Sequence, residues 1–560
     1  MTKRSDGEDS FGADTEGFDT QRVISRRKFL RDSALAAAGV AGIGSLSQLT
    51  TSVPRLAAAL PRSAKDTIVI GWHSEADTLD PSKAWDGWFS RLFTDGLVRF
   101  EGGGGEIMPA LATQWRASPD GKEWTFKIRS GVRFQDGTPM KAQDIQFSFD
   151  RWLNPKNPFY ESPCGTACYF FRAVEKVTAV DDRTVRFNLK NLDPAFLPAM
   201  LTVYSAPVSP EALKRLGNRG FGVKPVATGS FKVQEWIKGT RRVLERFDDY
   251  WGRRPILRRL IVKPIPEDAI RVAQLQRGEV DFIIEVPFEF IPTIQNDPNL
   301  RLLRADAHHV WWIPLNLHQK PLTDKRVRHA LNYAVNKEAI ARSLLKGGVT
   351  VAAGAMMKGW AEDPSLHPYP YDPQKAKQLL AAAGYPNGFR TRFWVPESGT
   401  GMVAPKAIAT VVQAQLREVG VIVEIETQEW TSYLNAYSSV GLDSGKPPFG
   451  MAEMSWNVHF PDPYLMDSVL LGDFRPPKGF NAGYYNNTEV NRLFKQAAET
   501  LDLNVRKRLY FQAQRIIYED APWIFMFHAQ NLVATRSNIR GYEVSATPWW
   551  LDFSKTYVAS

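Results

Sequence analysis

Short hydrophobic runs in the first half of the chain predict β-strands. Residues 67–72 form an apolar run, and residues 123–129 and 183–190 alternate polar and apolar side chains. A period of two is typical of a strand that buries one face. Residues 231–237 and 242–247 flank a short turn that contains glycine, which predicts a β-hairpin. We therefore expect the first half to be rich in strands.

Later in the chain, helical and strand patterns alternate. Asp372 and Pro373 provide an N-cap and a first-turn proline before a helical pattern. Residues 390–395 predict a strand, apolar residues within 408–419 recur at helical spacing, and residues 421–425 predict a second strand. Strand, helix and strand in this order form a βαβ unit, which implies that the two strands pair in parallel.

The length and composition are those of a globular protein that is large enough to form several domains. The chain has 560 residues, of which 44% are hydrophobic and 23% charged. We find no internal repeat and no long linker, so we expect lobes built from discontinuous segments. The net charge of +10 is spread without a run of Lys and Arg, which argues against a nucleic-acid partner.

Motifs typical of enzymes and metal sites are missing from the sequence. There is no Gly-x-Ser-x-Gly, His-Glu-x-x-His, Cys-x-x-Cys or Walker A motif. His308 and His309 are adjacent, and neighbours on a strand point to opposite faces, so a joint metal site there is improbable. We predict no catalytic residue, no metal and no cofactor.

The first sixty residues carry the features of an export signal. The run from Ser25 to Arg31 resembles a twin-arginine signal, in which Arg26, Arg27, Phe29 and Leu30 are the characteristic positions. An uncharged stretch rich in Ala and Gly follows, and small residues precede a predicted cleavage near Ala59. We expect residues 1–59 to be a leader and signal peptide that directs the protein to the periplasm through the twin-arginine export machinery. A retained membrane anchor is the alternative.

The chain has two cysteines, Cys164 and Cys168, four residues apart. In an oxidising compartment a disulfide between them is plausible, because the intervening glycine eases the tight loop. Two free buried thiols are the alternative.

A series of segments, in order, resembles one family of binding proteins. The series includes Ala76-Asp-Thr-Leu-Asp-Pro81, Met108-Pro-Ala-Leu-Ala-Thr-Gln-Trp115, Gly131-Val-Arg-Phe-Gln-Asp-Gly-Thr-Pro139 and Pro225-Val-Ala-Thr-Gly-Ser-Phe231. They are similar to the extracellular solute-binding proteins of family 5, which serve ABC importers of the peptide, nickel and opine type. The resemblance extends over nearly all of the chain that follows the predicted signal.

This resemblance implies an α/β, two-lobed periplasmic-binding-protein-like fold (type II, cluster C) with an extra small domain on lobe one. Lobe one is expected at 65–308, with the extra subdomain at about 100–205. Lobe two is expected at 309–525, and residues 526–560 return to lobe one.

The same resemblance implies a substrate-binding subunit that is a monomer and not an enzyme. It would capture a small-molecule or short-peptide ligand in the interlobe cleft and deliver it to the permease and ATPase subunits of an ABC transporter. Ligand contacts to both lobes would stabilise the closed form. Two alternatives remain open: an exported hydrolase of glycans or peptides, and an envelope chaperone that uses the same cleft.

A segment near residue 460 predicts part of the ligand site. In dipeptide binders of the family, an Asp before a Pro pairs with the ligand's ammonium group, and Asp462 occupies the matching position. The alternative is that Asp462 caps a helix that begins at Pro463. Trp456 is either a core residue or a wall of the ligand site. We also assign Asn457 and Trp430 to the candidate site.

Two further segments complete the predicted site. Dipeptide binders carry an Arg for the ligand carboxylate in the loop that corresponds to 396–404, and this loop has neither Arg nor Lys. Glu397 in the same loop adds a second acid, which favours a ligand with more than one amine or without that carboxylate. Trp85 and Trp88 follow the first strand and either stack on the ligand or belong to the core.

Overall fold

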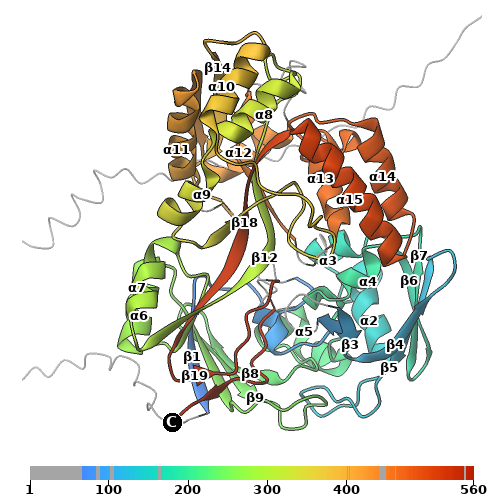
Figure 1. Ribbon diagram of the computed structural model, residues 1–560. Helices are drawn as coiled ribbons and strands as arrows, with labels where there is room; N and C mark the ends of the chain where they lie inside the picture. Colours follow the sequence, from blue (N-terminus) through green and yellow to red (C-terminus); the bar gives the residue numbers. More distant parts are fainter. Residues whose placement is uncertain are drawn as a thin grey trace, which may run out of the picture. The chain divides into compact units, whose positions relative to one another are not determined.

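The computed structural model (Figure 1) describes most of the chain beyond the predicted signal. The described residues are 66–83, 89–100, 106–161, 165–399, 401, 402, 404–439, 449–458, 460, 462–547 and 550–560. Several residues named above lie outside them: Arg26, Arg27, Phe29, Leu30, Ala59, Trp85, Trp88 and Cys164.

The largest sheet within the described residues has nine strands. Their order is β17-β12-β18-β11-β1-β10-β9-β8, and β13 pairs with β18 beside this path. The bounds are β1 (Thr67–Trp72), β8 (Phe231–Ile237), β9 (Arg241–Arg246), β10 (Arg259–Pro264), β11 (Phe282–Ile284), β12 (Leu300–Pro314), β13 (Val349–Val351), β17 (Met454–Asn457) and β18 (Trp523–Arg536).

The apolar run at 67–72 is β1, in the interior of this sheet, and it pairs in parallel with β10 and β11. Ile68, Ile70 and Trp72 are fully buried. A strand that is covered on both sides needs a nearly continuous apolar sequence, which explains the pattern. The predicted hairpin is also confirmed, because β8 and β9 pair antiparallel.

Two long antiparallel strands, β12 and β18, run side by side through the centre of Figure 1. Their pairing extends from Leu300 opposite Arg536 to Pro314 opposite Trp523, with register shifts between Asp306 and Val310 and between Trp311 and Trp312. The expected lobe boundaries at 308/309 and 525/526 fall inside these strands. The boundaries themselves stay predictions.

A separate four-stranded antiparallel sheet, in the order β4-β5-β7-β6, lies within the region assigned to the extra subdomain. Its elements are β4 (Ala112–Ala117), β5 (Glu123–Ile128), β6 (Val174–Asp181), β7 (Thr184–Leu189) and the covering helix α2 (Ala142–Leu153). The alternating residues of β5 and β7 place Phe126 and Phe187 inside, with ring centres 5.5 Å apart. Phe149 of α2 packs on Phe187 at 5.0 Å.

The predicted βαβ unit is confirmed. Strand β14 (Phe389–Pro396) pairs in parallel with β15 (Val421–Gln428) and with β16 (Met451–Ala452). Helix α11 (Pro405–Glu418) connects β14 to β15 and buries its apolar face against them. The preceding helix α10 (Pro373–Ala382) begins as expected, because the Asp372 side chain accepts a hydrogen bond from the Lys375 backbone N–H.

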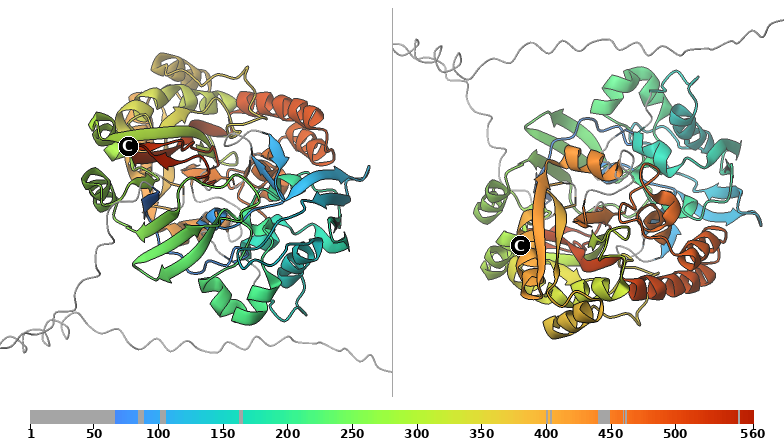
Figure 2. Two further views of the ribbon diagram at one scale, coloured as in Figure 1. Left: turned by 90° about the horizontal axis from the view of Figure 1, so that it is seen from below. Right: turned by 90° about the horizontal axis from the view of Figure 1, so that it is seen from above.

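The remaining elements are short strands and helices around these sheets. In the first half they are η1 (Phe89–Leu92), β2 (Val98–Phe100), β3 (Ile107–Pro109), α3 (Gly165–Phe170), α4 (Phe196–Ala199), η2 (Val203–Ser205), α5 (Pro210–Val223), α6 (Asp268–Arg277), η3 (Phe288–Phe290) and α7 (Ile291–Asn296). In the second half they are α8 (Lys325–Ala334), α9 (Lys337–Ala339), η4 (Ile340–Leu344), α12 (Trp430–Ser438), η5 (Pro463–Met466), α13 (Asp467–Leu470), η6 (Gly472–Phe474), α14 (Thr488–Ala498), α15 (Leu503–Asp520), β19 (Ile539–Arg540) and β20 (Tyr557–Val558). Helices α14 and α15 pack along each other (Figures 1 and 2).

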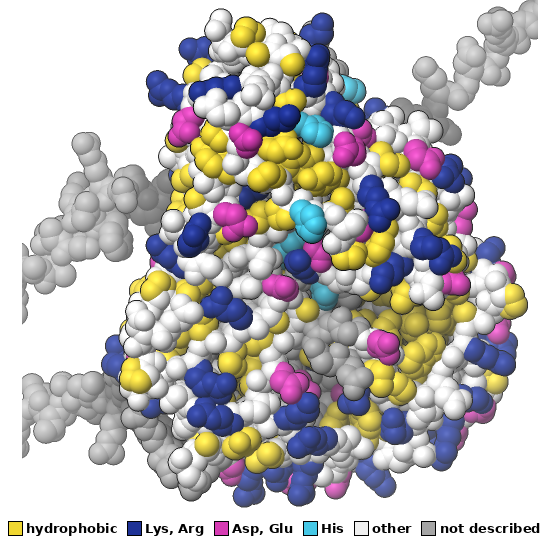
Figure 3. Space-filling view, viewed as in Figure 1, with side chains coloured by type: hydrophobic (Ala, Val, Ile, Leu, Met, Phe, Trp, Pro, Cys, Tyr) yellow, Lys and Arg dark blue, Asp and Glu magenta, His cyan; other side chains and the backbone are white. Residues whose placement is uncertain are grey.

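The face drawn in Figure 3 has a mixed surface. Lys and Arg side chains are interspersed with Asp and Glu, and hydrophobic side chains are visible in a hollow to the right of its centre. In the part of the chain that the structure describes, no helix has both the length and the apolar character that a bilayer span requires.

Candidate ligand-binding site

Strand β17 carries two of the predicted site residues next to the long strand β12. Asn457 lies opposite His309, Trp456 opposite Val310, and Ser455 opposite Trp311. Residues directly opposite each other in an antiparallel pair point to the same face. Asn457 and Ser455 therefore share a face with His309 and Trp311, whereas Trp456 points to the other face.

His309 is the buried centre of the first of these faces. Its Nε2 accepts a hydrogen bond of 2.8 Å from the Trp311 indole N–H. Burial lowers the pKa of His309 to about 3, so the ring is neutral at physiological pH. Sequence analysis considered this residue only as a possible metal ligand.

The loop after β14 lies against the His309 face. Gly401 has a positive φ of 74°, and a Cβ built there would be 2.9 Å from the His309 ring and 3.2 Å from the Ser455 hydroxyl. Only glycine allows both this backbone conformation and this close approach. Gly401 and His309 are therefore site residues that sequence analysis missed.

The same loop contacts the start of α12. A Cβ built on Gly399 would be 2.4 Å from the Trp430 ring, so the loop backbone lies directly on the indole. The Trp430 ring stacks in turn on Tyr433, with ring centres 6.1 Å apart. The structure thus brings the loop that carries Glu397 together with Trp430 and, through Gly401, with β17.

Asn457 and Trp456 have different surroundings. The Trp456 ring is half-buried and packs on Phe480 at 5.5 Å, as part of a larger hydrophobic cluster. The side-chain oxygen Oδ1 of Asn457 is buried and has no hydrogen-bond partner among the described residues. A buried acceptor without a donor costs about 1–3 kcal/mol, so a donor that reached Oδ1 of Asn457 would remove this cost.

Glu397 is exposed and has a cation nearby. Its side chain is 53% exposed, and the Lys406 ammonium lies 3.7 Å from its carboxylate. The positive charge of Lys406 therefore partly neutralises Glu397, the second acid that we expected in this loop. An exposed pair of this kind contributes little to stability.

Asp462 takes up the capping role that the sequence left open. Its carboxylate accepts the Tyr464 backbone N–H at 2.9 Å, at the start of η5. It also receives two hydrogen bonds from Arg506, at 2.9 and 2.6 Å, and is only 1% exposed. Both oxygens are thus already bound within the protein. The assignment of Asp462 to a ligand ammonium group stays a prediction.

The other predicted features give a mixed outcome. Cys168 is disulfide-bonded, and its expected partner Cys164 lies outside the described residues. In the described ranges, no group of three His, Cys, Asp or Glu side chains is arranged to hold a metal ion. Trp85 and Trp88 also lie outside these ranges, so their roles stay predictions.

Comparison with known proteins agrees with this architecture. Residues 106–473 match the model of the bacterial extracellular solute-binding proteins, family 5 Middle. The heme-binding protein A of Haemophilus influenzae is 34% identical over 80% of this chain and 83% of its own length. The dipeptide-binding protein of Escherichia coli K12 is 30% identical over 82% of this chain and 90% of its own length.

Solved structures give the same result. The structure of HbpA2 from Haemophilus parasuis superposes with a TM-score of 0.80 and 27% identity, over 88% of this chain and all of the other. The ABC transporter-associated periplasmic binding protein DppA from Helicobacter pylori, in complex with the peptide STSA, gives a TM-score of 0.68 and 27% identity, over 88% and 98%. The expected two-lobed α/β fold is therefore confirmed, and the chain belongs to the bacterial extracellular solute-binding proteins of family 5.

Proposed function

We propose that this protein is the substrate-binding subunit of an ABC importer and that it captures a peptide-like or other small polar solute. Relatives named for dipeptide and heme binding, and a neighbour described with a bound peptide, support this reading. Its action is reversible binding and not catalysis. Contacts from the solute to both lobes favour the closed form, which the membrane permease recognises.

The observation that carries the proposal is the meeting of three elements around His309. Asn457 of β17 offers a buried acceptor without a donor, and the loop at Gly401 lies within contact distance of the same ring. The Trp430 ring lies directly against the same loop at Gly399. An amide N–H of a peptide-like solute supplies the missing donor, and the indole rings provide flat apolar walls.

The chemistry of this loop restricts the solute further. Residues 396–404 contain no Arg or Lys, and the nearby Lys406 is directed to Glu397. A terminal carboxylate therefore has no guanidinium clamp at this place. We propose a solute that is held through amide hydrogen bonds and aromatic contacts here, with Trp456, Trp85 and Trp88 as further candidate walls.

We further propose that the protein reaches the periplasm through the twin-arginine machinery and is cleaved near Ala59. The run around Arg26 and Arg27 supports this route. Replacement of both arginines by lysine should leave the uncleaved protein in the cytoplasm, as measured by cell fractionation. Normal export of that variant would exclude the route.

The test of binding is native mass spectrometry of the folded protein, to identify the solute that co-purifies, followed by calorimetry with that solute. Asn457→Ala should weaken binding by about tenfold, because one hydrogen bond to a buried group is lost. Asn299→Ala is the matched control, because Asn299 is exposed and precedes the end of β12 that does not pair with β17. A solute that is returned chemically altered would support the hydrolase, and a preference for long unfolded chains would support the chaperone.

A further inference from the structure

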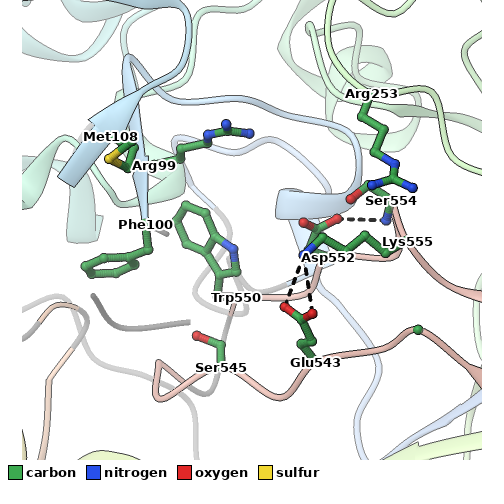
Figure 4. Close-up of a pocket in the computed structure, with 11 residues that line it drawn as sticks. Arg99, Phe100, Met108, Arg253, Glu543, Ser545, Trp550, Asp552, Ser554 and Lys555 are labelled. Atoms are coloured by element: carbon green, nitrogen blue, oxygen red, sulfur yellow. Dashed lines mark hydrogen bonds and ion pairs between the residues drawn. The ribbon is translucent and has the colours of Figure 1, made fainter. Parts of the chain in front are cut away.

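A cavity lies apart from the candidate site around His309. It has a volume of about 310 Å³ and is lined by residues of strands β2 and β3, by Arg253 and by described residues between Gly541 and Lys555 (Figure 4). A smaller neighbouring cavity shares five of its lining residues, among them Arg99, Arg253 and Trp550. None of the described residues of β17, α12 or the loop at 396–402 lines either cavity.

Most charged groups in these walls already have a partner. Lys555 binds the Glu543 carboxylate at 3.2 and 3.4 Å. The half-buried Asp95 carboxylate accepts hydrogen bonds from the Tyr250 hydroxyl at 3.1 Å and the Trp251 indole at 2.8 Å. The guanidinium of Arg91 lies 3.6 Å from the centre of the Trp550 ring. These contacts hold both the 250–254 loop and Trp550 in place.

The other two cationic side chains in these walls are those of Arg99 and Arg253. Arg99 on β2 and Arg253 are both exposed and line both cavities. Among the described residues, neither guanidinium group makes a hydrogen bond or an ion pair. In Figure 4 their side chains extend from different segments along the wall of the cavity.

One acidic side chain, that of Asp552, lies in the same wall and opposes the positive charge of the two guanidinium groups. Asp552 lines the same cavity and accepts a hydrogen bond of 2.7 Å from the Ser554 backbone N–H. It has no cation within ion-pair distance in the described part of the chain. Within the described residues, two cations without an ion-pair partner against one such carboxylate leave the wall with an excess of positive charge.

We propose that Arg99 and Arg253 form a binding site for a small oxyanion, a carboxylate or a phosphate, that is separate from the solute site. Guanidinium groups recognise carboxylate and phosphate oxygens through charge-assisted hydrogen bonds. A cavity of this size suits a small molecule rather than a macromolecule. The aromatic rings of Phe100 and Trp550, 5.4 Å apart, form an apolar wall beside the two cations.

The test is calorimetry of the full mature chain with citrate and, separately, with inorganic phosphate. Arg99→Gln and Arg253→Gln should each weaken binding by about tenfold, as expected for loss of a charge-assisted bond. Asp552→Asn should tighten binding, because it removes the opposing charge. Higher salt should weaken binding in every variant. Binding of citrate alone identifies a carboxylate site, and binding of phosphate alone identifies a phosphate site.

Arg254→Gln is the matched control. Arg254 is next in sequence and 61% exposed, but it lines neither cavity and faces Asp248 at 3.9 Å. The Arg254→Gln variant should bind citrate and phosphate with the same affinity as the parent protein. The proposal is overturned if neither probe binds, or if Arg99→Gln and Arg253→Gln bind as tightly as the Arg254→Gln control. Affinity for the co-purified solute is measured in the same variants and should not change, so failure here is distinguishable from failure of the proposed function.

Discussion

The carboxylate of Asp462 and the guanidinium of Arg506 form a bidentate ion pair that is almost completely buried. The two hydrogen bonds measure 2.9 and 2.6 Å, and the side chains are 2% and 4% exposed. The pair ties the start of η5 to helix α15 across 44 residues of sequence. Such a pair is costly to break, because either partner alone is a buried charge without compensation.

Arg506→Met should therefore lower the free energy of unfolding by about 3–5 kcal/mol, measured by urea denaturation. The double variant Asp462→Asn with Arg506→Met should recover part of that loss, because no unpaired charge remains. Arg492→Met, which removes only an exposed pair with Glu489, should change stability by less than about 1 kcal/mol. Equal unfolding midpoints for the parent and Arg506→Met would show that the pair does not stabilise the fold.

Gly401→Ala should weaken solute binding, because the new methyl group meets the His309 ring at 2.9 Å and displaces the loop. Gly131→Ala is the matched control: its φ of 75° imposes the same backbone strain, but a Cβ there has no atom within 4 Å. Calorimetry should give an affinity for Gly401→Ala about tenfold below that of the control, since a displaced loop loses its contacts. Similar affinities would mean that the loop does not contact the solute.

Lys337 should make stability rise with pH in the alkaline range. It is buried, and desolvation lowers its pKa from 10.5 to about 7. Between these values the unfolded chain holds a proton that the folded chain does not, so stability should increase by up to about 1.4 kcal/mol per pH unit. Urea denaturation of Lys337→Met between pH 7 and 9.5 should lack this slope. If the stability of Lys337→Met still rises with pH as steeply as that of the parent protein, then groups other than Lys337 cause the rise.

His528 should contribute to the acid sensitivity of the fold, together with His309, whose pKa is lowered in the same way. His528 is fully buried, and burial, followed by the charge of Lys358, lowers its pKa to about 3. Below pH 6.5 the unfolded chain binds a proton that the folded chain excludes, so this contribution to stability is lost as the pH falls from 6.5 toward 3. His528→Leu should flatten the fall in melting temperature between pH 6.5 and 4. An unchanged fall in this variant would contradict the assignment.

Local patterns predicted the elements well, because they depend on neighbours in sequence. The apolar run at 67–72 became an interior strand, and the spacing within 390–425 produced the parallel βαβ unit. The helix cap at Asp462 was predicted as an alternative, since capping depends on neighbours in sequence. Its ion pair with Arg506 was not predicted, because neither local sequence pattern indicates a contact between residues 44 positions apart.

The candidate site shows the same limit. Asn457, Trp430 and Glu397 came from the resemblance, and the structure places the segments that carry them close together. His309 and Gly401 were missed, because their importance arises from the approach of a loop to a distant strand. A glycine in a loop and a histidine on a strand are each unremarkable in sequence, and only the fold places them so close that a Cβ on Gly401 would lie 2.9 Å from the His309 ring.

The long pairing of β12 with β18 has a mechanical consequence. A hydrogen-bonded ribbon resists bending along most of its length, and twisting it stores torsional energy across many residues. The ladder is interrupted between Asp306 and Val310, where the register shifts. A second shift lies close by, between Trp311 and Trp312. Rotation of one lobe against the other should concentrate at these two irregular places, so their stiffness should govern how readily the lobes separate and how quickly a bound solute dissociates.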